Sequence, residues 1–213
     1  MIASSLTSPA SSVKVYARDL KDAKLLSSGP RGVNAPHMTP LDAARLVLAI
    51  LTTNKPAECV ERVRRFGPIP YSPTSSSSFA WRETIQPDEF ARTFEGETLE
   101  EVLAYLFAIP ARLGIPEACE WFQRHVFHLD VYDFEVRAEL VEWQQAGGKV
   151  VAERVVPFQG ETMIKGEDGA FRHIEGFAPI KGGVTARRRL KPLRFLEIGL
   201  GLLMDDEGKI DDE

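Results

Sequence analysis

The sequence is poor in cysteine and has no long apolar run. It holds two cysteines, Cys59 and Cys119, among 213 residues, too few for the disulfide framework of a small secreted domain. The longest apolar stretches, 46–51 and 102–109, are far shorter than the roughly 20 residues that span a bilayer. The N-terminus, MIASSLTSPASS, lacks the charged start and apolar run of a secretion signal. We therefore expect a cytoplasmic protein with reduced thiols that does not associate with membranes.

Patterns typical of metal, nucleotide and catalytic sites are also missing. Cys119, His125 and His128 lie close together in the sequence, but a zinc site needs a second pair of ligands. The segment 181–185 has the residue types of a phosphate-binding loop in the wrong order, and the serine run 75–78 has no nucleophile elbow. We expect no cofactor and no metal, and an enzyme is the least favoured class.

The charge is distributed unevenly along the chain. The net charge is −5, with +5 on residues 1–66 and −10 on the remainder. Contact with phosphates needs positive charge only at the site of contact, so a basic N-terminal part on an acidic body suits nucleic-acid binding.

Residues 1–66 have the pattern of a helical module. Ser11 and Ser12 are typical N-cap residues before an apolar-periodic segment that runs to Leu26. A second helix is expected over 40–51, because Thr39 and Asp42 have the spacing of a capping box. A third is expected to begin at 54–56 and to end at Phe66.

A proline- and serine-rich segment, GPIPYSPTSSSS, follows and favours extended chain. We interpret it as a domain boundary. The predicted organisation is a DNA-binding module at 1–66, a linker at 67–80, an α+β domain of unknown role at 81–204, and an acidic tail at 205–213.

The second part of the chain changes from helical to strand-like periodicity. Helices are expected over 87–94, 98–109 and 116–126, and a final helix over 192–204. Thr98 and Glu101 repeat the capping-box spacing at the start of the second of these. Between them, a small antiparallel sheet of three or four strands is expected. The strand candidates are 131–143, 149–158, 171–177 and 183–190. The fold class that follows is α+β, with a helical N-terminal module, a small antiparallel sheet and a C-terminal helix.

The segment SSVKVYARDLKDAKLLSSGPRG resembles the recognition helix and wing of winged helix-turn-helix proteins. Val13, Ala17 and Leu20 stand at the positions that face the protein, and Gly29–Gly32 stands at the tip of the wing. The resemblance implies double-stranded DNA as the partner, with the helix lying in the major groove. Replacing Lys14 or Arg18 by alanine would then cost about 1–3 kcal/mol of binding. The implied DNA-binding residues are Ser11, Ser12, Lys14, Val15, Arg18, Lys21 and Arg31.

Two features depart from the winged-helix pattern. Lys24 stands where these proteins often have glycine, and MIASSLTSPA leaves no room for a complete preceding helix. Support for the recognition helix is then expected from upstream sequence, from the helices at 40–66, or from a second subunit. The simpler interpretation is an amphipathic helix with scattered cations that packs within the fold.

A longer pattern in the sequence resembles a group of uncharacterised, often prophage-associated bacterial proteins. It consists of VKVYARDLKDAKLL, GPRG, MTPLDAARLVLAIL and a late GGVTARRRL. The resemblance implies a transcriptional regulator or a DNA-packaging role, and we expect a homodimer. The alternative is a non-enzymatic interaction or phage assembly protein whose N-terminal helices bind a protein partner. The cluster Arg187–Arg189 indicates either a charge-protected edge strand or a second phosphate-contacting patch.

Overall fold

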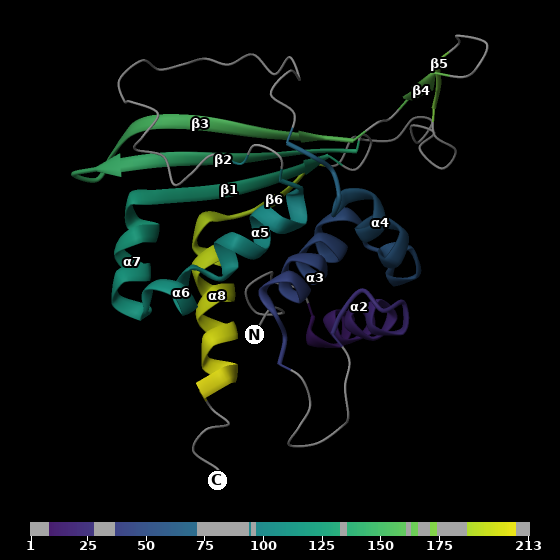
Figure 1. Ribbon diagram of the computed structural model, residues 1–213, viewed down its shortest axis with the longest axis horizontal. Coiled ribbons are helices and arrows are strands. Elements are labelled where there is room, and N and C mark those ends of the chain that lie inside the picture. The colour runs from purple at the N-terminus through teal and green to yellow at the C-terminus, as the bar shows by residue number, and fades with distance from the viewer. Residues whose placement is uncertain are drawn as a thin grey trace.

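Helices cover one face of a four-stranded antiparallel sheet (Figure 1). The computed structural model describes residues 9–27, 37–71, 94, 97–132, 136–160, 163–165, 171–173 and 187–207. The helices are α2 (Ala10–Asp22), α3 (Pro40–Thr52), the 3-10 helix η1 (Pro56–Glu58), α4 (Cys59–Phe66), α5 (Leu99–Phe107), α6 (Ile109–Leu113), α7 (Ile115–Arg124) and α8 (Pro192–Glu207). The strands are β1 (His125–Tyr132), β2 (Arg137–Ala146), β3 (Lys149–Gln159), β4 (Met163–Lys165), β5 (Phe171–His173) and β6 (Arg187–Leu190). The expected α+β class is confirmed.

The sheet has the strand order β3-β2-β1-β6, and all of its pairs are antiparallel. Strands β2 and β3 form a hairpin in which Ala146 pairs with Lys149. The two loop residues between them, Gly147 and Gly148, have φ of +57° and +74°. A two-residue hairpin loop with positive φ at both positions matches the twist of the strands, which explains the glycine pair. Strands β4 and β5 form a separate two-stranded pair.

Two helices begin at the capping boxes that the sequence predicts. In α3 the Thr39 hydroxyl accepts the backbone N–H of Asp42, and the Asp42 carboxylate accepts the N–H of Thr39. In α5 the Glu101 carboxylate accepts the backbone N–H of Thr98 at 2.8 Å. Each box satisfies backbone donors that a helix start leaves open, so both starts are fixed locally.

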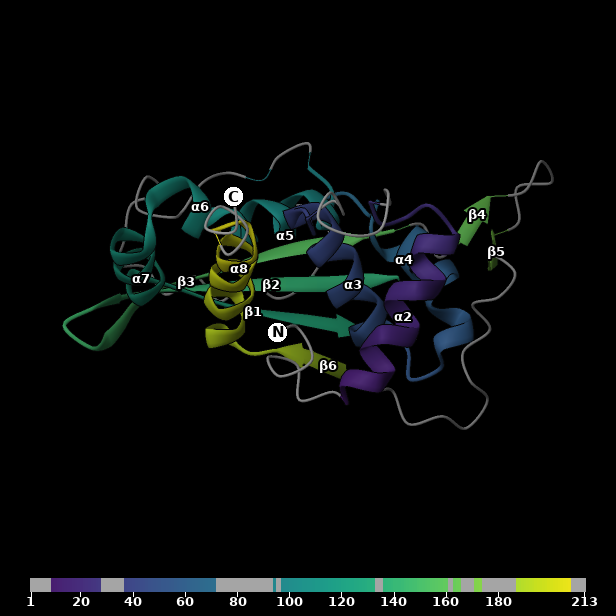
Figure 2. The same cartoon turned by 90° about the horizontal axis from the view of Figure 1, so that it is seen from below.

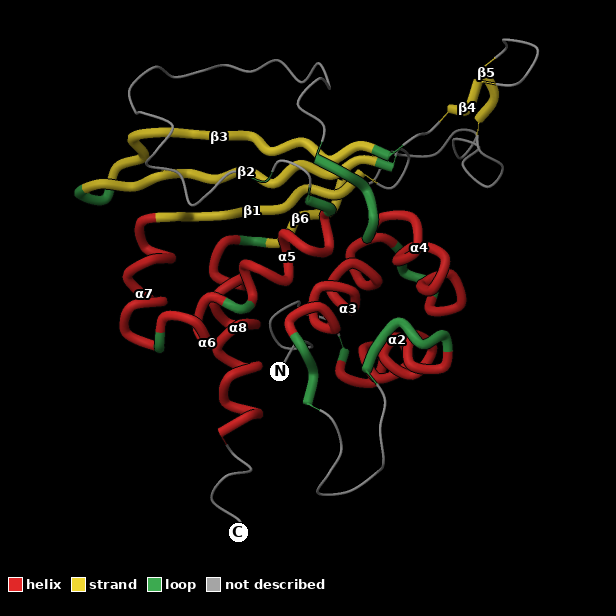
Figure 3. The backbone as a smooth tube through the Cα atoms, in the orientation of Figure 1, coloured by secondary structure: helices red, strands yellow, loops and turns green. Residues whose placement is uncertain are grey.

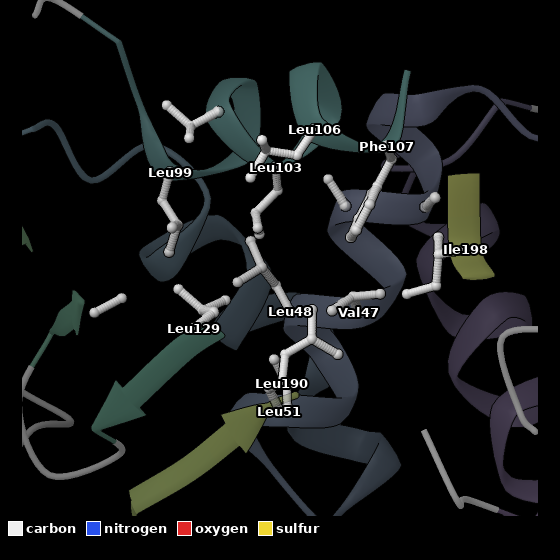
Figure 4. Close-up of a cluster of buried hydrophobic side chains, with 14 of the residues drawn as sticks. Val47, Leu48, Leu51, Leu99, Leu103, Leu106, Phe107, Leu129, Leu190 and Ile198 are labelled. Carbon is white, nitrogen blue, oxygen red and sulfur yellow. The ribbon is translucent and has the colours of Figure 1, made fainter. Parts of the chain in front are cut away.

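The core is centred on α3, which packs between α2, α4, α5 and β6 (Figures 1 and 3). Figure 4 shows Val47 and Leu48 of α3 meeting Leu103 and Phe107 of α5, with strand residue Leu129 and others around them. Buried side chains from both sides of the predicted boundary therefore form one continuous core. Residues 67–71 contribute to it: Ile69 is buried and its carbonyl accepts the N–H of Leu99.

Several predicted elements have different bounds in the structure. The first helix ends at Asp22 instead of Leu26, and the single strand candidate over 131–143 is two strands, β1 and β2. The last helix continues from Pro192 to Glu207, into the predicted acidic tail. The helix expected over 87–94 lies outside the described residues except for Phe94, which is buried.

None of the described helices is both long enough and apolar enough to span a membrane.

Candidate nucleic-acid interface

Helix α2 packs against the rest of the protein through one face. Leu20 and Tyr16 are buried, and Val13 and Ala17 are half-buried against the same core. These positions follow the i, i+3, i+4, i+7 spacing of one side of a helix. The prediction that Val13, Ala17 and Leu20 face the protein agrees with this packing.

Tyr16 was not assigned a role from the sequence, although it completes the spacing of the inner face. Its hydroxyl donates to the Thr53 carbonyl at 3.0 Å, just beyond the end of α3. Burial, with a smaller effect of the nearby Cys59 thiol, raises the pKa of Tyr16. The group stays protonated and keeps α2 attached to α3.

The opposite face of α2 carries a line of exposed residues. Ser11, Lys14, Arg18 and Lys21 are all exposed, and their spacing of three, four and three residues places them along one side of the helix. We call these four residues the basic stripe. Helix α2 lies on the side of α3 and α4 that is remote from the sheet, and Figure 2 shows it from that side.

The three cations of the basic stripe differ in whether they form an ion pair within the protein. Arg18 pairs with Asp19 through Nη2 to Oδ1 at 3.1 Å, with 69% of the Arg18 side chain exposed. Among the residues that the structure describes, Lys14 and Lys21 form no ion pair. Lys14 and Lys21 are therefore the cations most readily offered to an anionic partner.

The remaining predicted DNA-binding residues are placed differently. Ser12 and Val15 are half-buried, so they border the basic stripe instead of lying on it. Arg31 and the rest of the predicted wing tip, 29–32, lie outside the described residues.

The start of α2 places backbone amides that have no partner within the helix beside the basic stripe. Pro9 is the N-cap, it supplies no side-chain hydrogen bond, and the first turn holds no acidic residue. The first backbone bond of the helix runs from the N–H of Val13 to the Pro9 carbonyl at 3.2 Å. The amides of the first turn have no partner within the helix, and such amides suit an anion.

The end of α2 is a Schellman motif built on Lys24. The N–H of Leu25 bonds to the Leu20 carbonyl and the N–H of Lys24 bonds to the Lys21 carbonyl, both at 2.9 Å. Lys24 has φ of +59°, the left-handed conformation that glycine adopts at the same position in many helices. The turn therefore forms with lysine where the winged-helix pattern often has glycine.

Helix α3 fixes the chain on both sides of the predicted wing. One Asp42 oxygen accepts the N–H of Ser27 at 2.8 Å, and the other accepts the N–H of Thr39 at 2.9 Å. Arg45 donates to the Leu25 carbonyl at 3.0 Å and forms a two-point ion pair with Glu100 of α5. A single carboxylate thus holds the residues that precede and follow segment 28–36.

We expect Asp42→Asn to destabilise the protein in a pH-dependent manner. Burial opposes ionisation of Asp42, but the hydrogen bonds from Thr39 and Ser27 outweigh it and lower the pKa of the carboxyl. A lowered folded-state pKa gives stability that is present above the unfolded pKa and is lost as pH falls through the folded pKa. Near pH 7 the variant should lose about 1–3 kcal/mol, since an amide cannot accept both N–H groups.

Thermal unfolding at a series of pH values checks this expectation. The difference between Asp42→Asn and the wild type should shrink below about pH 4, where the carboxyl of the unfolded chain becomes protonated. Asp22→Asn at the exposed end of α2 is the matched control and should have little effect. A difference that stays constant from neutral to acidic pH would show that the ionised carboxylate is unimportant.

The supporting helices follow α2 in the chain. Helix α2 contacts α3, η1 and α4. These are the helices at 40–66, one of the three expected sources of support for the recognition helix. In the helix-turn-helix arrangement the supporting helix precedes the recognition helix. The described residues therefore supply a supported basic helix in a different chain order.

Two arginines of the late cluster, Arg188 and Arg189, make contacts within the fold. Arg189 forms a two-point ion pair with Asp130, from Nε to Oδ1 at 2.8 Å and from Nη2 to Oδ2 at 2.9 Å. Arg188 donates to the Leu51 carbonyl at 3.2 Å, at the end of α3. These arginines lie on β6, which is an edge strand of the sheet. This position agrees with the interpretation of the cluster as a charge-protected edge strand.

A second buried ionic group lies at the other end of β1, on the face that carries the helices. Glu142 of β2 is fully buried, and its oxygens contact His125 Nδ1 at 2.8 Å and Arg154 Nη2 at 2.5 Å. The Trp121 ring of α7 lies 4.6 Å from the His125 ring, between centroids. No local pattern in the sequence indicates this group, because its members lie on three different strands.

The two histidines that follow Cys119 in the sequence, His125 and His128, have different partners. His125 contacts Glu142, and His128 Nε2 lies 3.4 Å from Asp130 Oδ2. No group of three or more potential metal ligands occurs among the described residues. Segments 75–78 and 181–185 lie outside the described residues.

Comparison of the chain with models of protein families, with curated proteins and with solved structures finds no match.

Proposed function

We propose that this protein binds double-stranded DNA through the basic stripe of α2, in a non-catalytic role. The observation that carries the proposal is the exposure of Lys14, Arg18 and Lys21 along one side of a helix whose other side is anchored in the core. A helix of 13 residues is about 20 Å long, and the major groove admits a helix of this kind. Anchoring the inner face holds the cations in fixed positions, which lowers the entropy lost on binding.

The distribution of charge supports an anionic partner at this end of the chain. The chain has a net charge of −5, yet the outward side of α2 presents lysine and arginine close to first-turn amides that have no partner within the helix. Phosphates satisfy both kinds of group, because they accept hydrogen bonds and carry negative charge. Asp19 pairs with Arg18 and so reduces the attraction of this arginine for phosphates. We therefore assign the larger share of the binding free energy to Lys14 and Lys21.

Lys14→Ala is expected to weaken duplex binding by about 1 kcal/mol and to reduce the salt dependence by about one released counterion. The measurement is fluorescence anisotropy of a labelled random duplex over a series of salt concentrations. Lys149→Ala removes the same charge from the exposed β2–β3 hairpin, far from α2 in Figure 1, and should leave both quantities unchanged. Equal losses in the two variants would mean that net charge alone matters, and would remove the assignment of α2.

A transcriptional regulator in the cytoplasm is the role that we propose for this interface. A regulator needs selective as well as non-specific affinity, and half-buried Val15 beside the basic stripe can contact a thymine methyl group. A selection of tight binders from random duplexes tests this part. Enrichment of a shared sequence is expected, whereas binding that is equal for all sequences would favour a packaging role.

A further inference from the structure

Helix α8 carries apolar side chains on both of its faces. Phe195, Ile198 and Leu202 face the core and are buried. On the other side, Leu193 is 72% exposed and Met204 is 59% exposed. These two residues are 11 positions apart, about three turns of helix, so they lie on the same line along the helix surface. Leu200 stands between them on this line and is half-buried.

The outward line of α8 holds the exposed and half-buried residues on the side opposite Phe195, Ile198 and Leu202. Its four positions are Leu193, Glu197, Leu200 and Met204, spaced at i, i+4, i+7 and i+11. Three of the four are apolar, and Glu197 is paired with Arg194 of the same helix. In Figure 1 the C-terminal end of α8 extends beyond α6 and α7, away from the sheet. An exposed apolar line of this spacing is typical of a helix that packs against another helix.

The charges of α8 oppose its own dipole. The first turn contains Arg194 and no acidic residue, Lys191 immediately precedes the helix and is exposed, and the sequence of the last turn ends in Asp205-Asp206-Glu207. A helix start favours negative charge and a helix end favours positive charge, so this order is unfavourable for an isolated helix. The arrangement becomes favourable when a second helix of the same sequence runs alongside in the opposite direction.

We propose that α8 pairs with α8 of a second copy of this chain, antiparallel and about a two-fold axis. In this arrangement Leu193 lies beside the partner subunit's Met204, and the basic start of each helix lies beside the acidic end of the other. An isologous contact of this kind uses the same surface on both copies, as two-fold dimers do. The interface is small, because it rests on one helix of 16 residues, and we expect a dimer that dissociates on dilution.

The charge pattern of α8 favours a second copy of this helix over other binding partners. A membrane surface or a partner of one charge sign would match only one end of α8, because the two ends have opposite signs. A reversed copy of the same helix matches both ends at once. This inference does not depend on DNA binding, since the basic stripe lies on α2 and no contact of α2 is used.

Cross-linking between engineered cysteines tests the pairing and its direction. In a Cys119→Ser background, the double variant Leu193→Cys/Met204→Cys should form a disulfide-linked dimer under mild oxidation. Leu193→Cys alone should form little, because the two copies of residue 193 lie about 16 Å apart along the axis of an antiparallel pair. A dimer linked as efficiently by Leu193→Cys alone would overturn the antiparallel arrangement.

Analytical ultracentrifugation of uncross-linked protein tests the energetics. The mass should rise from monomer towards dimer with concentration, and Leu193→Ser should weaken the dimer at least tenfold. Val150→Ser, which alters an exposed apolar residue of β3, should leave the dimer unchanged. A wild-type protein that stays monomeric throughout, or equal effects of the two serine variants, would overturn the proposal.

A charge exchange separates this interface from a general loss of stability. Lys191→Glu should stabilise the isolated helix but weaken the dimer several-fold, because it places like charges beside the partner's acidic end. Adding Asp206→Lys should restore the dimer, since the two signs are then exchanged together. Failure of the double variant to recover would show that the ends of the two helices do not meet.

Discussion

Glu142→Gln is expected to destabilise the protein by about 3–5 kcal/mol, the largest effect that we predict for a single substitution. Glu142 is fully buried in β2, and its carboxylate lies between His125 and Arg154. The substitution keeps the volume of the side chain but removes the negative charge that contacts Arg154 and His125. The ion pair with Arg154 is then lost at a place where the arginine side chain is only 17% exposed, so water compensates little for the loss.

Chemical denaturation measured for three variants checks this expectation. Glu153→Gln is the matched control: Glu153 is exposed on the next strand and accepts one hydrogen bond from Trp143 Nε1, so a change below about 0.5 kcal/mol is expected. The double variant Glu142→Leu/Arg154→Leu should recover most of the loss, because apolar side chains can replace a buried ion pair. A Glu142→Gln variant as stable as Glu153→Gln would show that the ionic group contributes nothing.

Gly199→Ala is expected to destabilise the protein by about 2 kcal/mol, although alanine is the better helix former by about 1 kcal/mol. A Cβ built at Gly199 would lie 2.7 Å from the Phe107 carbonyl oxygen and 2.8 Å from the Pro110 ring. Helix α8 therefore approaches α5 and α6 closely at this glycine. The carbonyl belongs to the backbone and cannot rotate away, so the helices must separate to accept the methyl group.

A double-mutant cycle with Pro110→Ala tests the cause of this effect. Removing the proline ring takes away two of the three close neighbours, so the loss in Gly199→Ala/Pro110→Ala should be smaller than the sum of the two single losses. Stabilisation by Gly199→Ala, the result that helix propensity alone predicts, would contradict the packing of α8 described above.

Local signals in the sequence predicted most of the helices. The capping boxes at Thr39 and Thr98 are complete within four residues, so their starts could be read without knowing the fold. The first helix was predicted to continue to Leu26 because Leu25 and Leu26 continue the apolar run. The helix ends before Leu26, at the turn formed by Lys24. Leu26 is buried because this turn directs the chain back towards the core, and not because the helix continues.

The strands were harder to predict because polar residues interrupt their alternation. Asp130 and Glu142 are fully buried on strands, where the pattern predicts apolar residues. Their partners, Arg189 and Arg154, lie 59 and 12 positions away in the sequence, so nothing local showed that these charges are paired. This helps to explain why the predicted strand 131–143 missed residues 125–130 of β1.

The candidate interface could be predicted in part. Spacing alone placed Val13, Ala17 and Leu20 towards the protein and Lys14, Arg18 and Lys21 away from it. Spacing could not show that Arg18 pairs with its neighbour Asp19, nor that Ser12 and Val15 are half-buried beside α2's packing face. These details depend on how α3 and α4 lie against α2, which is a property of the fold.

Titration of a random DNA duplex tests the central claim most directly, with the wild type compared with Lys14→Glu/Arg18→Glu/Lys21→Glu. If the basic stripe contacts about three phosphates, affinity of the wild type should fall about 40-fold between about 50 mM and about 200 mM salt. The triple variant, whose changes all lie at exposed positions, should remain folded and show no binding at the lower salt concentration. A wild type without affinity at low salt, or a folded triple variant that binds equally well, would contradict the assignment of α2 as a DNA-binding helix.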